Sequence, residues 1–127
     1  MAVILDTNAV SSLLAGDPAL GDLLAARPRH HLPVMVIGEY LFGLLRSRHR
    51  DRLELLLAAL IRESIVLVVD ETTAEVYSRV REELRAKGRP IPENDVWIAA
   101  LALQHEQPVV SRDDHFDPVR GLVRLRW

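Results

Sequence analysis

Glu39 is the residue whose type and surroundings most strongly suggest chemistry. It is the only charged residue in the apolar segment LPVMVIGEYLFGLL, which runs from Leu32 to Leu45. A helix this apolar should be buried, and a buried carboxylate is costly unless it is paired, protonated or bound to a metal. Gly38 and Gly43 each cost about 1 kcal/mol in a helix interior, which predicts a close approach to the backbone here. Alternatively, Glu39 lies at an edge and reaches water or a partner arginine.

Three aspartates stand where predicted strands end or predicted helices begin. Asp6 follows an apolar run, Asp95 opens an apolar helix, and Asp113 follows a run that ends in a serine. Two of them have an ordinary alternative role: Asp6 could cap a helix, and Asp95 could complement a helix dipole. Asp114 and Asp117 compete with Asp113 for its role.

The combination of these four acids is more informative than any one of them. Two carboxylate charges about 4 Å apart repel by about 4 kcal/mol at an effective dielectric constant of about 20. Four converging carboxylates would therefore destabilise a fold unless protons or cations intervene. The chain has no cysteine, and an all-oxygen cluster suits magnesium or manganese better than zinc.

The elements that must position these acids alternate between strands and helices. Apolar periodicity and turn residues predict strands at 2–5, 65–69, 107–111 and 122–125, and a very short strand or only a turn at 31–32. Helices are predicted at 8–14, 18–26, 33–48, 52–62, 72–86 and 92–105, with Asp70 as the N-cap of the fifth. This alternation predicts an α/β sandwich with a mostly parallel sheet, whose sites lie at the carboxyl ends of the strands.

Length and composition fit one domain spanning residues 1–127. The chain is 49% hydrophobic and 27% charged, the balance of a globular protein. It has no apolar run of the roughly 20 residues that cross a bilayer and no secretion signal, so we expect a cytoplasmic protein. Its net charge of -2 does not by itself indicate a nucleic-acid-binding protein. The arginine clusters at 46–52 and 79–89 suit phosphate, but a GC-rich coding sequence would also produce them.

Several aromatic and apolar side chains have two open interpretations. Tyr40, Phe42 and Leu44 could form a dimer surface, although packing in the core is the simpler expectation. Trp97 is expected in the core at helical spacing rather than as a platform for a nucleobase.

At the four acids the sequence resembles the PIN-domain family, and more closely the VapC toxins of toxin–antitoxin pairs. The motifs that carry the resemblance are ILDTN at 4–8, VIGEYLFG at 36–43, ENDVWIAALAL at 93–103 and VVSRDDHFD at 109–117. They occur in the family's order and span nearly the whole chain. Each is weak alone, and together they are specific.

The resemblance implies a three-layer α/β/α fold around a central, mostly parallel sheet of four or five strands. It implies that Asp6, Glu39, Asp95 and Asp113 form a catalytic, metal-binding pocket for Mg²⁺ or Mn²⁺, supported by Asn8. Ser111 is implied as the second supporting residue. Asp113 is preferred to Asp114 because the family's last acid directly follows a Thr/Ser-Arg pair.

The resemblance also implies an activity and partners. The expected activity is hydrolysis of RNA phosphodiester bonds by a water that the metal activates. The expected partners are an RNA substrate, a VapB-like antitoxin and a second copy of the chain. DNA would be contacted only through the antitoxin, and no membrane is involved.

Three rival functions remain at this point. An aspartyl-phosphate phosphatase also begins with a strand and an aspartate, but it needs a second acid two residues later, where this chain has Asn8. A non-catalytic module could use the acids to hold a structural ion. A structure-specific DNA nuclease of the related class would need insertions for which 127 residues leave no room.

Overall fold

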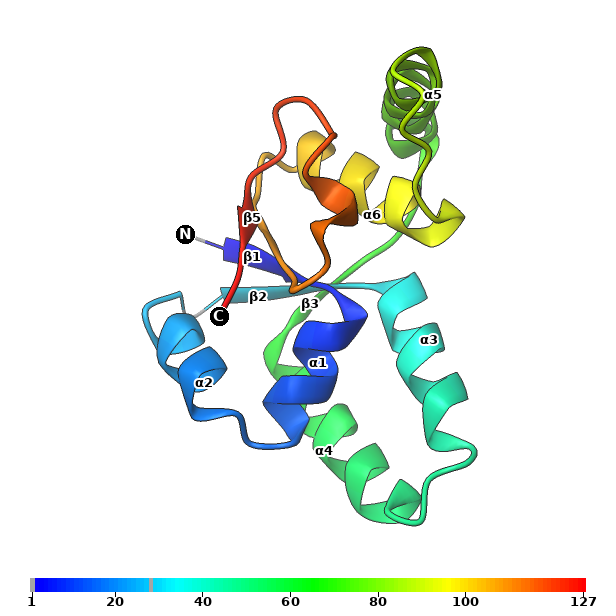
Figure 1. Ribbon diagram of the computed structural model, residues 1–127. Helices are drawn as coiled ribbons and strands as arrows, with labels where there is room; N and C mark the ends of the chain where they lie inside the picture. The colour runs from blue at the N-terminus through cyan, green and yellow to red at the C-terminus, as the bar shows by residue number, and fades with distance from the viewer. Residues whose placement is uncertain (1, 28) are drawn as a thin grey trace.

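A five-stranded sheet in which every neighbouring pair is parallel forms the centre of the protein (Figure 1). The computed structural model describes residues 2–27 and 29–127. The strands are β1 Ala2–Leu5, β2 Arg29–Pro33, β3 Ile65–Leu67, β4 Val109–Val110 and β5 Arg124–Leu125, in the order β3-β2-β1-β4-β5. The predicted α/β class and parallel sheet are confirmed.

Helices cover both faces of this sheet. The helices are α1 Thr7–Leu14, α2 Pro18–Ala25, α3 Val34–Leu44, α4 Arg50–Glu63, α5 Glu71–Ala86, α6 Glu93–Gln104 and the short 3-10 helix η1 Asp114–Phe116. In Figure 1, α1 to α4 lie below the sheet and α5, α6 and η1 lie above it. The predicted three-layer arrangement is therefore confirmed.

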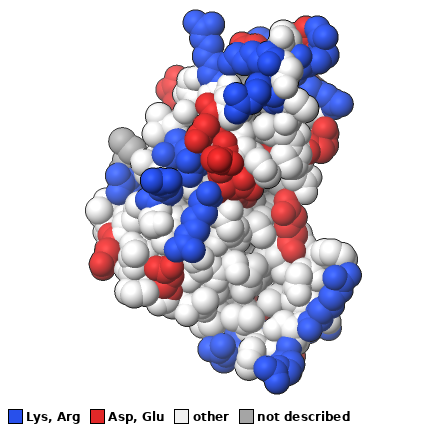
Figure 2. All heavy atoms as spheres, viewed as in Figure 1, with Lys and Arg blue, Asp and Glu red and all other residues white. Residues whose placement is uncertain are grey.

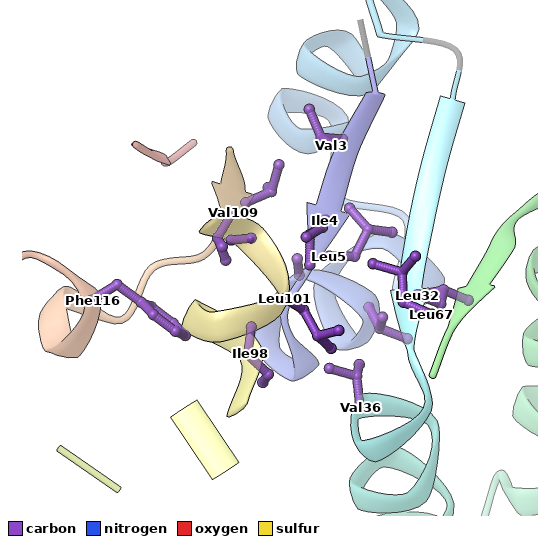
Figure 3. Close-up of a cluster of buried hydrophobic side chains, with 14 of the residues drawn as sticks. Val3, Ile4, Leu5, Leu32, Val36, Leu67, Ile98, Leu101, Val109 and Phe116 are labelled. Atoms are coloured by element: carbon purple, nitrogen blue, oxygen red, sulfur yellow. The ribbon is translucent and has the colours of Figure 1, made fainter. Parts of the chain in front are cut away.

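The central strand β1 explains why the sheet holds together. Val3, Ile4 and Leu5 are fully buried, as expected for a parallel strand covered on both faces. Ile98 and Leu101 of α6 lie among the buried side chains around β1 (Figure 3). The acids that follow β1 and begin α6 are thus anchored to elements whose side chains form the buried core.

The structure corrects the predicted strands on one side of β1. Residues 31–32 are not merely a turn, because β2 runs over five residues and pairs with β1 from Ala2 opposite Arg29. The strand predicted inside the sheet at 65–69 is shorter, and it is an edge strand. Ile65 is 52% exposed. An apolar β-branched run has the same pattern at an edge as in the interior, so the pattern could not separate the two.

The predicted burial of α3 on all sides is wrong. Val36, Tyr40 and Leu44 are buried at helical spacing, whereas Leu41 and Phe42 are exposed, Phe42 by 62%. The helix also ends at Leu44 rather than near residue 48. Of the side chains that could have formed a dimer surface, Tyr40 and Leu44 are therefore core, and Phe42 lies on the surface of the chain.

The glycines of α3 do not mark a close approach. A Cβ added at Gly38 or Gly43 would meet no described atom within 4 Å. The expectation that something crowds the backbone here is not met within the described part of the chain.

Trp97 differs from its predicted place in the core. It is half-buried, and its ring stacks on Tyr77 of α5 with 3.8 Å between ring centroids and 14° between ring planes. The stack joins α6 to α5 and stabilises that pair of helices by about 0.5–1.5 kcal/mol beyond area burial.

Asp70 caps α5 as predicted. Its carboxylate accepts a hydrogen bond from the Thr73 backbone nitrogen at 3.0 Å, and Thr73 Oγ1 accepts one in return from the Asp70 nitrogen. Asp70 is thereby accounted for as a structural residue. Within the described residues, no helix has both the length and the apolar character that a membrane span requires.

Candidate active site

The four predicted acids line one cleft, with a volume of ≈ 820 Å³. Asp6 is the N-cap of α1, directly after β1, and Glu39 lies in the middle of α3. Asp95 lies in the first turn of α6, and Asp113 is the N-cap of η1 after β4. Three of these positions follow the carboxyl ends of strands or open a helix. The parallel sheet thereby gathers side chains that are up to 107 positions apart in the sequence.

Asp6 is held rigidly at the floor of the cleft. Its side chain accepts hydrogen bonds from the Thr7 backbone nitrogen at 2.8 Å and from Ser111 Oγ at 2.7 Å, and Asp6 is only 5% exposed. Burial raises the pKa of the Asp6 carboxyl, and repulsion from Glu39 and Asp113 raises it further. Asp6 therefore caps α1, as the alternative role predicted, and also lines the cleft.

The predicted supporting residues connect Asp6 to Asp113. Ser111 is fully buried, and its hydroxyl accepts hydrogen bonds from Asn8 Nδ2 at 3.2 Å and from the Asp113 backbone nitrogen at 2.9 Å. Asn8 Nδ2 also lies 3.4 Å from Asp6 Oδ2. This network fixes the end of β4 against the start of α1.

Asp95, Asp113 and His115 form the tightest group in the cleft. His115 Nδ1 lies 3.2 Å from Asp95 Oδ2 and 2.9 Å from Asp113 Oδ1. One potential ligand atom from each residue falls within 4.8 Å of the others. Burial raises the pKa of Asp95 to about 6, with further repulsion from Asp6. The hydrogen bond with Asp95 raises the pKa of His115 in turn.

Glu39 is half-buried and is not the isolated buried charge that the sequence suggested. Its Oε1 accepts a hydrogen bond from Asn94 Nδ2 at 2.7 Å, and its Oε2 accepts one from Thr7 Oγ1 at 3.2 Å. These contacts join α3 to the starts of α6 and α1. The carboxylate faces the shared cleft, and no arginine partner is recorded for it among the described residues.

Sequence reasoning missed three residues of this site: Thr7, Asn94 and His115. Thr7 and Asn94 each adjoin a predicted acid within a quoted motif, so their positions were the only available signal. His115 lies two residues after Asp113, in the short helix η1 and within the quoted motif at 109–117, where no periodicity identifies it.

The acids that competed with Asp113 are engaged or exposed elsewhere. Asp117 pairs with Arg124, with its Oδ1 2.7 Å from Nε, and this ion pair lowers the pKa of Asp117. Asp114 is exposed and does not line the cleft.

The cleft is strongly acidic. Its lining includes five carboxylates and one arginine, Arg112. Figure 2 shows acidic side chains gathered near the centre of the face in view, with basic side chains above them and to their left. Burial raises the pKa values of Asp6 and Asp95, and repulsion from neighbouring carboxylates adds to the rise. Buried oxygen donors in such a group fit a hard divalent cation.

Comparison with known proteins gives one family match. The family model described as PIN domain matches residues 3–122. Ribonuclease VapC5 of Mycobacterium tuberculosis is 33% identical over 94 residues, which are 72% of this chain and 70% of that protein. Toxin FitB of Neisseria gonorrhoeae is 31% identical over 123 residues, or 87% of each chain.

A solved structure agrees with these sequence matches. The crystal structure of VapBC-5, a member of the VapBC family of toxin–antitoxin systems from Mycobacterium tuberculosis, contains a chain that superposes with a TM-score of 0.76. The superposition is at 26% identity and covers 99% of this chain and 98% of that one. The likeness extends over both helical layers and the sheet.

Proposed function

Because the chain belongs to the PIN-domain family, we propose that it is a metal-dependent endoribonuclease that acts as the toxin of a VapBC-type toxin–antitoxin pair. The observation that carries this proposal is the convergence of Asp6, Glu39, Asp95 and Asp113 in one cleft. The names of its relatives, Ribonuclease VapC5 and Toxin FitB, supply the substrate class and the biological role.

We assign Asp6, Asp95 and Asp113, together with Glu39, to holding Mg²⁺ or Mn²⁺. A bound divalent cation supplies an activated water and offsets the charge that builds up on the phosphate during hydrolysis. The cation also relieves the repulsion between the carboxylates, so binding and folding favour each other.

The remaining residues of the site position these acids. Ser111 and the Thr7 backbone nitrogen fix the carboxylate of Asp6, while Asn94 and Thr7 Oγ1 fix that of Glu39. Because donors on neighbouring elements already hold these two carboxylates, little reorganisation of Asp6 and Glu39 is needed when substrate binds.

The proposed partners follow from the relatives. We propose an RNA substrate, a VapB-like antitoxin and a homodimer, with the antitoxin rather than this chain contacting DNA. We expect the protein to act in the cytoplasm, where its RNA substrates are.

The function is tested with purified protein and a labelled RNA mixture. We expect cleavage with Mg²⁺ or Mn²⁺, no cleavage with excess EDTA, and a loss of at least about 100-fold in Asp6→Asn, Glu39→Gln, Asp95→Asn and Asp113→Asn. Asp114→Asn is the matched control, because it removes an adjacent carboxylate outside the cleft. Cleavage that persists in excess EDTA would contradict the proposal.

Two further measurements separate this function from its rivals. Release of phosphate from a small phosphate ester, lost in Asp6→Asn while RNA stays intact, would favour a phosphatase. Growth arrest on expression, relieved by co-expressing the neighbouring open reading frame, is the result expected of a toxin.

A further inference from the structure

Arg112 is the one arginine or lysine among the described residues that line the acidic cleft. Its side chain is 55% exposed, and its Nη2 lies 3.2 Å from Asp17 Oδ2. Its guanidinium carbon lies 4.7 Å from the centroid of the Trp127 ring. The Trp127 indole donates its own hydrogen bond to the same Asp17 oxygen, at 3.2 Å. Arg112 is thus held by two residues far from it in sequence.

Asp17 is well suited to hold these two side chains. It is the N-cap of α2, and its Oδ1 accepts hydrogen bonds from the backbone nitrogens of Ala19 at 3.0 Å and Leu20 at 3.2 Å. The other oxygen, Oδ2, is left for Arg112 and Trp127. The carboxylate is therefore anchored on one side and presents a fixed acceptor on the other.

This arrangement keeps the positive charge of Arg112 away from the clustered carboxylates of the cleft. Arg112 directly precedes Asp113, and its backbone nitrogen donates to Asn8 Oδ1 at 3.1 Å, within the network that holds Asp6. An unrestrained arginine here would be attracted to the clustered carboxylates and compete with a cation for them. Pairing with Asp17 and stacking on Trp127 keep the guanidinium at the rim.

The guanidinium keeps unused donors in that position. An arginine side chain has five N–H groups, and the structure records one side-chain hydrogen bond for Arg112, to Asp17. The paired geometry of the free N–H groups matches phosphate oxygens. In a cleft of five carboxylates that repel a polyanion, this is the position from which a nucleic-acid backbone can be attracted.

We propose that Arg112 binds a backbone phosphate of the RNA strand at the rim of the acidic cleft, and that Asp17 and Trp127 are positioning residues for it. The proposal rests on the proposed function, because it assumes that the strand is the substrate of the cleft. A contact to phosphate rather than to a base is independent of sequence.

The phosphate contact is tested by its salt dependence. The probes are short fluorescein-labelled single-stranded RNAs of mixed and of homopolymeric sequence. Their binding is measured by fluorescence anisotropy between about 50 and 200 mM salt, with Ca²⁺ in place of Mg²⁺ or Mn²⁺. We expect Arg112→Gln to weaken binding about tenfold at low salt, equally for each sequence, and to reduce the slope of log affinity against log salt by about 0.7. Arg62→Gln is the charge-matched control, because Arg62 is exposed on α4 outside the cleft lining.

The outcomes separate the two proposals. If the wild type neither binds nor cleaves RNA, the proposed function fails. If the wild type binds and cleaves RNA but Arg112→Gln has the same slope as Arg62→Gln, the phosphate contact is refuted. A loss confined to one sequence would refute it as well, in favour of a base contact.

The positioning role has its own test. Asp17→Asn keeps an acceptor for the N-cap of α2 but removes the charge that holds Arg112. We expect this variant to bind Mn²⁺ several-fold more weakly by calorimetry, and Asp17→Asn/Arg112→Gln to regain the affinity of Arg112→Gln. Weakening that persists equally in the double variant would show that Asp17 acts on the site without Arg112.

Discussion

At the scale of single residues, the candidate site combines burial with unrelieved like charge. Asp95 is 9% exposed and lies near Asp6 and Asp113, which together with burial raises its pKa to about 6. Only the partly exposed His115 offers it a cationic partner in the described chain. An arrangement of this kind costs stability, and active sites use it to shift the pKa values of their acids.

This cost predicts that Asp95→Asn stabilises the metal-free protein at neutral pH. The pKa of Asp95 is raised from 3.8 to about 6 in the folded state, so the folded protein binds more protons than the unfolded chain between these values. Its stability contribution is therefore lost as pH rises through that window. We expect Asp95→Asn to gain about 1–3 kcal/mol in urea unfolding with EDTA above about pH 7, and almost nothing near pH 4.

The comparison includes Asp114→Asn as a control, which should change the free energy of unfolding little at either pH. If Asp95→Asn instead destabilises the metal-free protein at neutral pH, the acid has a structural role.

Protonation at the same residues predicts that metal affinity depends on pH. Asp95 must lose its proton to bind a cation, and protonated His115, whose pKa is raised, repels a cation placed beside it. Mn²⁺ affinity should therefore rise steeply from about pH 5 to about pH 7 and then level off. Calorimetric titration across this range checks the expectation, and an affinity that does not change with pH would contradict it.

At the scale of elements, α3 shows how hydrophobicity can mislead. Its segment is apolar on nearly every side, yet only the stripe of Val36, Tyr40 and Leu44 is buried. Sequence hydrophobicity cannot distinguish a helix enclosed by its own chain from one with an exposed apolar face. The half-exposed setting of Glu39 has the same origin.

The two faces of α3 should respond differently to truncation. Leu44 is 4% exposed, so Leu44→Ala should lower the free energy of unfolding by about 2–4 kcal/mol. Phe42 is 62% exposed and its ring contacts the Arg46 guanidinium, so Phe42→Ala should cost less than about 1 kcal/mol. Equal losses in urea unfolding would contradict this expectation and show that both faces of α3 are buried in solution.

At the scale of the whole molecule, the α/β class and the parallel sheet could be predicted from the sequence alone. Apolar runs followed by Asp6 and Asp113 identified strand ends, and the alternation of strands with helices identified a parallel sheet. The position of a strand within the sheet depends on contacts across the chain, so Ile65 was wrongly placed in the interior. His115 could not be found because its role depends on two partners from different elements.

The fold brings together side chains that carry no shared local pattern. The inner strands β1 and β4 place Asp6 and Asp113 at the carboxyl ends of the strands, and α6 and α3 bring Asp95 and Glu39 to the same cleft. Because the site depends on the relative positions of these elements, its chemistry is a property of the assembled sheet rather than of any one motif.

The location of bound Mn²⁺ in crystals tests this account most directly, because its anomalous signal identifies the ion and its ligands. We expect Mn²⁺ in the cleft, with carboxylate oxygens of Asp6, Asp95 and Asp113 either about 2.1 Å away or bridged by water, and Glu39 beside it. A cleft that stays empty at saturating Mn²⁺ and neutral pH, while the wild-type protein still cleaves RNA, would contradict the account.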